Sequence, residues 1–200
     1  MVDLCVRGGT VYDPTNQVDG AVMDVWIDGG KIVPRPADGA AGKVLDARGY
    51  VVFPGGVDMH THLVGPKVNA ARGLRPEVKR GAGESGPTPS TRQTGLKYAS
   101  LGFTTVIDAA VAPFFARQAH LELADTPLID KGFLALISDN LFVLDAVRDR
   151  DGDRLDAFVS WLLTTVGAFG VKAVNPGGVE QWKEAGRRTL VDLDATVDAF

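Results

Sequence analysis

The chain has 200 residues, of which 45% are hydrophobic and 23% charged, and its 21 basic and 25 acidic side chains give a net charge of −4. This composition excludes a disordered chain, and the absence of a basic excess argues against nucleic acid as a partner. The single cysteine, Cys5, excludes an internal disulfide and a cysteine zinc site. Neither a signal-peptide pattern nor a long apolar span occurs in the sequence, so we expect a cytoplasmic protein with no membrane partner.

Residues 1–53 show short strand patterns separated by tight turns. Apolar and polar residues alternate from Val2 to Arg7, and similar patterns follow at 10–12, 22–27, 31–33 and 43–46. Asp28-Gly29-Gly30 is typical of a hairpin turn because these residues accept positive φ angles. We therefore predict a small N-terminal β-sandwich element over residues 1–53, with no chemistry of its own.

The segment Pro54-Gly55-Gly56-Val57-Asp58-Met59-His60-Thr61-His62 follows an apolar run, Tyr50–Phe53, that indicates the approach to a buried strand. Side chains alternate between the two faces of a strand, so we expect Asp58, His60 and His62 to share one face. Two imidazoles in this arrangement suit one zinc ion, with the Asp58 carboxylate orienting a ring N–H. The alternative is an ordinary pair of histidines, because His-x-His also recurs by chance.

Between His62 and Pro87 the sequence has few periodic apolar residues and many glycines, prolines and charges, which predicts a long loop. Long loops inside compact domains are often functional. If His62 ends the first strand of a parallel barrel, this loop lies at the carboxyl end of the strands, where barrel active sites are built. Four of its side chains are either ligands for an anionic or amide-bearing substrate or solvated loop groups: Lys67, Asn69, Arg72 and Arg75.

Apolar strands then alternate with helical segments. Thr88-Pro89 indicates the start of a helix that runs to Leu101. Further strands are predicted at 103–108, 133–138 and 171–174, and further helices at 113–124 and 153–169. His120 lies within a helical pattern, and we interpret it as a structural or surface residue. The alternation predicts an α/β fold in which residues 54–200 form the first half, about four βα units, of a (β/α)8 TIM-type barrel.

Lys172 falls in the last of these predicted strands, within Gly170–Gly178. A lysine in a parallel strand is costly unless it is paired or lies at an open end. Burial would favour the neutral amine, which can react with carbon dioxide to give an anionic carbamate able to bridge two metal ions. The residues alone leave this reading and a lysine that simply projects into solvent equally open.

The run from Pro54 to His62 resembles the first-strand signature of the amidohydrolase superfamily. Its continuation to Glu77 resembles the amidohydrolase subunit of formylmethanofuran dehydrogenases and of the related formyltransferase/hydrolase complexes. The resemblance implies a binuclear site with two divalent metal ions, zinc by expectation, in which His60 and His62 hold the first metal and carboxylated Lys172 bridges both. It also implies hydrolysis of the N-formyl amide of a formylmethanofuran-type one-carbon carrier to formate and free amine, or the reverse condensation, alongside other subunits.

The chain departs from this family in length and ligands. A complete barrel needs about 250 residues, and the two later histidines and general-base aspartate that the resemblance implies have no counterpart, since His120 is the only histidine left. We therefore expect the sequence to be the N-terminal part of a longer protein and to be inactive alone. Two alternatives stay open: a cyclic-amide hydrolase of the dihydroorotase or hydantoinase type, and a non-catalytic half-barrel scaffold for a partner subunit.

Overall fold

The computed structural model of the chain describes residues 1–73, 89–138 and 140–174. The chain divides into two compact units, Met1–Gly55 and Gly56–Phe200. No helix within the described ranges is long and apolar enough to cross a membrane.

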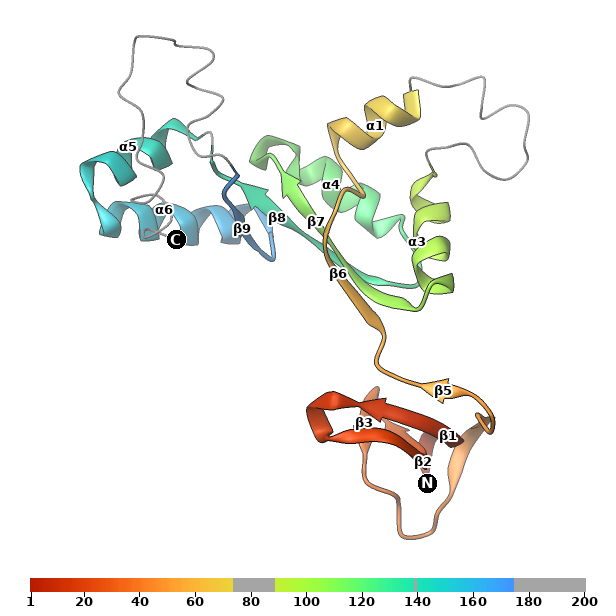
Figure 1. Ribbon diagram of the computed structural model, residues 1–200. Coiled ribbons are helices and arrows are strands. Elements are labelled where there is room, and N and C mark those ends of the chain that lie inside the picture. Colours follow the sequence, from red (N-terminus) through yellow and green to blue (C-terminus); the bar gives the residue numbers. More distant parts are fainter. Residues whose placement is uncertain (74–88, 139, 175–200) are drawn as a thin grey trace. The chain divides into compact units, whose positions relative to one another are not determined.

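The first unit is a single five-stranded β-sheet (Figure 1). Its strands are β1 (Val2–Asp13), β2 (Val18–Asp28), β3 (Lys31–Val33), β4 (Ala41–Asp46) and β5 (Val51–Val52), and the short 3-10 helix η1 (Pro14–Asn16) joins β1 to β2. The order is β3-β2-β1-β4, with β5 also paired to β1. The pairs β1–β2 and β2–β3 are antiparallel, whereas β4 and β5 run parallel to β1.

Two expectations for this unit are changed by the structure. The described residues show one sheet and no second layer, so the sandwich is not confirmed. The apolar run Tyr50–Phe53 does not lead into the next unit's sheet but supplies β5, whose Val52 pairs with Val11. This strand fits closely against Gly9, where an added Cβ would lie 2.5 Å from Val52 Cγ2.

The second unit is built on a four-stranded parallel sheet in the order β6-β7-β8-β9. The strands are β6 (Gly56–Thr61), β7 (Phe103–Val111), β8 (Asp130–Leu136) and β9 (Gly170–Lys172). The connecting helices are α1 (Pro66–Gly73), α3 (Thr91–Ser100), the 3-10 helix η2 (Pro113–Phe115), α4 (Ala116–Ala124), α5 (Leu141–Asp149) and α6 (Gly152–Val166). Strands that are consecutive in sequence are therefore neighbours in the sheet, as βα repeats require.

Helices cover one face of this sheet through two apolar clusters (Figure 1). In the first, Val106 of β7 and Phe133 of β8 pack against Ala119 of α4. In the second, Ile137 and neighbouring residues after β8 pack against α5 and α6. Val57 of β6 points away from these clusters and is 56% exposed, so part of the opposite face is open to solvent among the described residues.

The helices differ from the sequence prediction at three places. The predicted loop after His62 contains α1, which the sequence hides because its apolar positions are few. Helix α3 begins later than predicted: Ser90 is its N-cap, and a capping box with Gln93 fixes the start, while Thr88 lies outside the described residues. Helix α5 was not predicted; Asn140 caps it by accepting hydrogen bonds from two backbone N–H groups.

Candidate active site at the carboxyl end of the sheet

The chemically distinctive side chains lie at the carboxyl ends of the parallel strands. His60 is near the end of β6 and His62 follows it, while Lys172 is the last residue of β9. These two strands are the first and last in the order β6-β7-β8-β9, so the histidines and the lysine share an end of the sheet but not neighbouring strands. This end is where the loops of parallel α/β folds build active sites.

The two histidines form a close pair. Their ring centroids are 6.4 Å apart, and the rings stand edge to face at 80°. Nδ1 of His62 lies 3.6 Å from Oδ1 of Asp108, whose side chain is 1% exposed, whereas the His62 side chain is 45% exposed. A histidine whose one ring nitrogen faces a carboxylate has the other nitrogen suited to bind a metal ion.

The predicted strict alternation along β6 is wrong at one place. Asp58 pairs with Val106 and Thr61 with Asp108, so β6 uses three residue steps where β7 uses two, which is a β-bulge. As a result Asp58 and Thr61, which alternation would put on opposite faces, both contact the hydroxyl of Tyr98. The Asp58 carboxylate also accepts a hydrogen bond from the backbone N–H of His60, while the carboxylate beside the His62 ring is that of Asp108.

Tyr98 of α3 fixes the outer side of this strand. Its hydroxyl lies 3.0 Å from Oδ2 of Asp58 and 2.9 Å from Oγ1 of Thr61. Burial raises the pKa of Tyr98 above its ordinary value, and the Asp58 carboxylate adds to the rise while the hydrogen bond to Thr61 opposes it. The phenol therefore stays neutral to a higher pH in the folded chain than in the unfolded chain.

Tyr98→Phe is expected to lower the free energy of unfolding by about 1–2 kcal/mol, because it removes both hydrogen bonds. The pH dependence follows from the raised pKa: the unfolded tyrosine ionises first, so stability declines as the pH rises above about 10. Urea unfolding between pH 8 and pH 11 checks both effects. The phenylalanine variant should lose less stability than the wild type over the alkaline range; equal alkaline losses would contradict the assignment.

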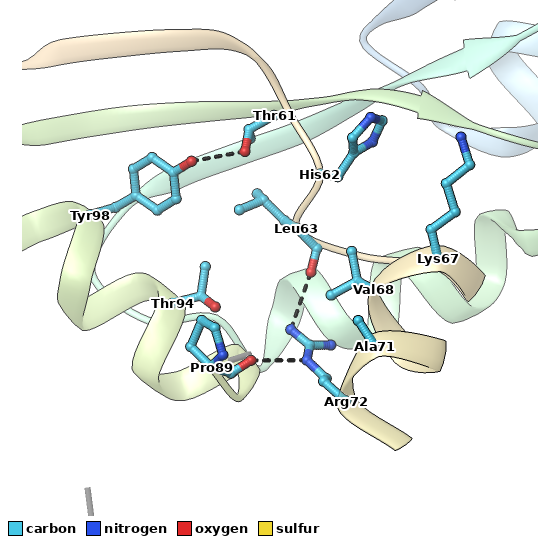
Figure 2. Close-up of a pocket in the computed structure, with 10 residues that line it drawn as sticks. All are labelled: Thr61, His62, Leu63, Lys67, Val68, Ala71, Arg72, Pro89, Thr94 and Tyr98. Atoms are coloured by element: carbon cyan, nitrogen blue, oxygen red, sulfur yellow. Dashed lines mark hydrogen bonds between the residues drawn. The ribbon is translucent and has the colours of Figure 1, made fainter. Parts of the chain in front are cut away.

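A pocket of about 410 Å³ lies between β6, α1 and α3 (Figure 2). Its lining includes His62, Lys67, Thr94 and Tyr98. Lys67 is exposed, and in Figure 2 its side chain extends on the same side of the chain as the His62 ring. The pocket thus places an exposed cation near one of the predicted metal ligands.

Two other candidates for substrate binding have their polar atoms engaged within the chain. Arg72 donates to the carbonyl oxygens of Pro89 and Leu63 at 3.0 and 3.2 Å (Figure 2) and to Oδ1 of Asn69 at 3.1 Å. Burial lowers the pKa of Arg72, and the nearby Glu122 carboxylate opposes that change. The amide nitrogen of Asn69 donates to Oε1 of Glu122 at 2.5 Å. These contacts hold α1 in place, and the fourth candidate, Arg75, lies outside the described residues.

Sequence reasoning missed the two buried carboxylates, Asp108 and Glu122. Asp108 ends a β-branched run within a strand that is otherwise apolar, and an acid there is a signal that could have been followed. Glu122 stands beside Leu123 and three residues from Ala119, both buried, so its position on the covered side of α4 was also readable. By contrast, His120 is structural, as predicted: its Nε2 lies 2.8 Å from the Val166 carbonyl oxygen, and its ring packs on Phe133.

The donors present fit part of a metal site. Two imidazoles at the end of one strand match the ligand chemistry of zinc. Within residues 1–73, 89–138 and 140–174 no group of three or more histidine, cysteine, aspartate or glutamate side chains is arranged to hold a metal ion. At the neighbouring strand end, Ser138 is 2% exposed and its Oγ has no hydrogen-bond partner among the described residues. A buried hydroxyl without a partner is uncommon and marks a place where a further group can bind.

Known proteins share this sequence and fold. The chain is 44% identical over 190 residues to Protein FwdA of Methanocaldococcus jannaschii, which covers 90% of this chain and 33% of that protein. It is 36% identical over 196 residues to the A-type subunit of the formyltransferase/hydrolase complex Fhc of Methylorubrum extorquens, which covers 94% of this chain and 35% of that protein. The chain therefore spans about a third of the length of these curated relatives.

The fold comparison agrees with the sequence comparison. The crystal structure of the formyltransferase/hydrolase complex FhcABCD from Methylorubrum extorquens, in complex with methylofuran, superposes with a TM-score of 0.84 and 33% identity, covering 98% of this chain and 39% of that chain. The parallel sheet of the second unit accordingly corresponds to part of an amidohydrolase barrel. The sequence pattern of the amidohydrolase family matches residues 43–198, and the chain belongs to this family.

Proposed function

We propose that this chain is part of an amidohydrolase that hydrolyses the N-formyl amide of a formylmethanofuran-type carrier, or runs the reverse condensation, within a larger complex. The observation that carries this proposal is the similarity, over 90% or more of the chain, to FwdA and to the corresponding Fhc protein. The position of His60, His62 and Lys172 at one end of the parallel sheet supports it from the structure. Formate and the free amine of the carrier are the expected products of hydrolysis.

The proposed metal site uses His60 and His62 for the first of two divalent ions, with zinc the ion that best suits two imidazoles. Carboxylated Lys172 is the proposed bridging ligand, and the unpartnered hydroxyl of Ser138 lies at the next strand end, one residue after Ile137, whose N–H donates to the Lys172 carbonyl oxygen. When bound, such metals polarise a carbonyl and bring the pKa of water near neutrality. The part of the chain's own residues is to hold these ligands and to bind the substrate.

Each remaining candidate has a proposed part. Asp58 fixes the backbone of His60 through its N–H, and Tyr98 holds Asp58 from the other side. Lys67, exposed beside the pocket, is positioned to meet a negative charge on the substrate, and Arg75 is proposed for the same purpose. Asn69 and Arg72 are proposed to contribute by holding α1, since their donors are engaged within the chain.

Other subunits are the proposed partners. The relative from Methylorubrum extorquens belongs to the FhcABCD complex. His60, His62 and Lys172 supply only part of a binuclear ligand set, so we also propose that residues 1–200 alone have no turnover.

The test is substrate choice. The polypeptide, purified from its native cells with the subunits that accompany it, is supplied with N-formylmethylofuran, hydantoin or dihydroorotate, and formate release or ring opening is followed. We expect kcat/KM for the formyl compound to exceed the cyclic amides by at least about 100-fold. Preference for a cyclic amide would replace this proposal with the dihydroorotase or hydantoinase type, to which the chain is less similar. Turnover of neither class by a metal-loaded preparation would favour a scaffold.

A further inference from the structure

Three consecutive backbone N–H groups directly after the histidine strand are bound by two buried carboxylates. Leu63 N and Val64 N donate to Oδ2 of Asp108 at 2.7 and 3.0 Å. Gly65 N donates to Oε2 of Glu122 at 3.0 Å. The side chains of Leu63 and Val64 are buried in the first apolar cluster, so this short segment is held through both its backbone and its side chains.

Asp108 links this segment to the ring of His62. Its side chain is fully buried, and its second oxygen, Oδ1, accepts a hydrogen bond from Ala110 N at 3.1 Å and lies 3.6 Å from Nδ1 of His62. Both oxygens of this carboxylate are therefore engaged by backbone N–H groups, and the carboxylate cannot turn without breaking a bond. The ring of His62 faces a negative group whose position is fixed by the sheet.

Glu122 does the same for the helix that carries Lys67. Besides Gly65 N, it accepts hydrogen bonds from the side-chain amides of Asn69 and Gln118 at 2.5 and 2.9 Å. The Arg72 guanidinium lies 3.7 Å away and balances its charge. Because Asn69 and Arg72 belong to α1, Glu122 sets where this helix, and with it Lys67, stands relative to the pocket.

We propose that Asp108 and Glu122, here called the carboxylate clamp, are positioning residues: Asp108 orients the His62 ring for its metal, and Glu122 sets the placement of Lys67 for the substrate. The part concerning metal and substrate rests on the function proposed above; the orientation of the ring does not. The two carboxylates come from different elements, β7 and α4, and act on one continuous stretch from Leu63 to Arg72.

The first variant is Asp108→Asn. An asparagine has one acceptor oxygen and one NH₂ group, so whichever way it turns, a backbone donor of Leu63, Val64 or Ala110 faces another donor. The His62 ring also loses its carboxylate. We expect a weakening of metal binding by about 10–100-fold, a changed visible spectrum of the cobalt-loaded protein, and, in the metal-free protein, shifted ring resonances of 13C-labelled His62 with His60 unchanged.

The second variant, Glu122→Gln, acts on the same stretch from α4 and keeps the test decisive if Asp108→Asn does not fold. We expect it to raise KM for the formyl substrate by about tenfold while kcat and the cobalt spectrum stay at their wild-type values, because uniform binding is lost and the metal is untouched. Asp156→Asn, on the exposed surface of α6, is the matched control and should change none of these quantities.

The outcomes separate the two levels of the proposal. Wild-type His62 resonances in Asp108→Asn, or a wild-type KM in Glu122→Gln, would overturn the corresponding half of the clamp and leave two structural carboxylates. If the wild-type protein binds no cobalt but the His62 resonances still move in Asp108→Asn, the orienting part of the inference stands and the proposed function fails. All measurements use the full native polypeptide with its accompanying subunits.

Discussion

Gly95→Ala is expected to lower the free energy of unfolding of the α/β unit by about 3 kcal/mol. Gly95 is buried in α3, where an added Cβ would collide with the carbonyl oxygen of Pro127 and lie 2.7 Å from its Cδ and 2.9 Å from its N. At an open helix position the same change would raise stability by about 1 kcal/mol, because alanine is the better helix former. The close approach of the backbone to Pro127 reverses the sign.

Gly152→Ala is the matched control for this prediction. Gly152 is the first residue of α6, and no atom lies within 4 Å of the position of an added Cβ. Urea unfolding monitored by circular dichroism should show a lower midpoint for Gly95→Ala and an unchanged or slightly higher midpoint for Gly152→Ala. Equal midpoints in the two variants would mean that α3 moves away from Pro127 at little cost.

The double variant His60→Ala, His62→Ala is expected to lose the first metal ion, with affinity reduced by more than the roughly 100-fold typical of changes to residues that only support ligands. The reason is that both imidazoles of the close pair are removed while the surrounding sheet is kept. Metal content is measured after dialysis against a fixed zinc concentration, together with formate release.

His120→Ala is the control, since His120 is the third histidine of the chain and its ring contacts Val166 and Phe133 and not the histidine pair. It should keep its metal and its activity while losing about 1 kcal/mol of stability. Retention of wild-type zinc by the double variant, with His120→Ala also unchanged, would remove His60 and His62 from the proposed site.

The strands of the α/β unit could be predicted because each is a local property of the sequence. Phe103–Val111 is rich in β-branched and small apolar residues, and its position between two helical patterns indicates a parallel strand. Helix α1 could not be predicted in the same way. Its exposed, polar composition carries no apolar stripe, and it is held by the side chains of Asn69 and Arg72 reaching Glu122, some fifty residues later.

The candidate site divides along the same line. The His60–His62 pair was visible because its spacing is local, and the structure places the two rings 6.4 Å apart. The bulge in β6 was not visible, because it is defined by the pairing of Asp58 and Thr61 with the separate strand β7. Asp108 was missed for that reason too: its bonds to Leu63 and Val64 join residues 45 and 44 positions apart.

The hydrogen bonds of Leu63, Val64 and Gly65 to buried carboxylates also bear on how the molecule opens. Loop amides usually exchange their hydrogens with solvent through small local fluctuations, whereas amides of a core exchange only when the core opens. These three lie outside any helix or strand, yet their acceptors belong to β7 and α4. In deuterated water they should therefore exchange as slowly as the central strands, so that the end of the histidine strand loosens only when the sheet itself unfolds.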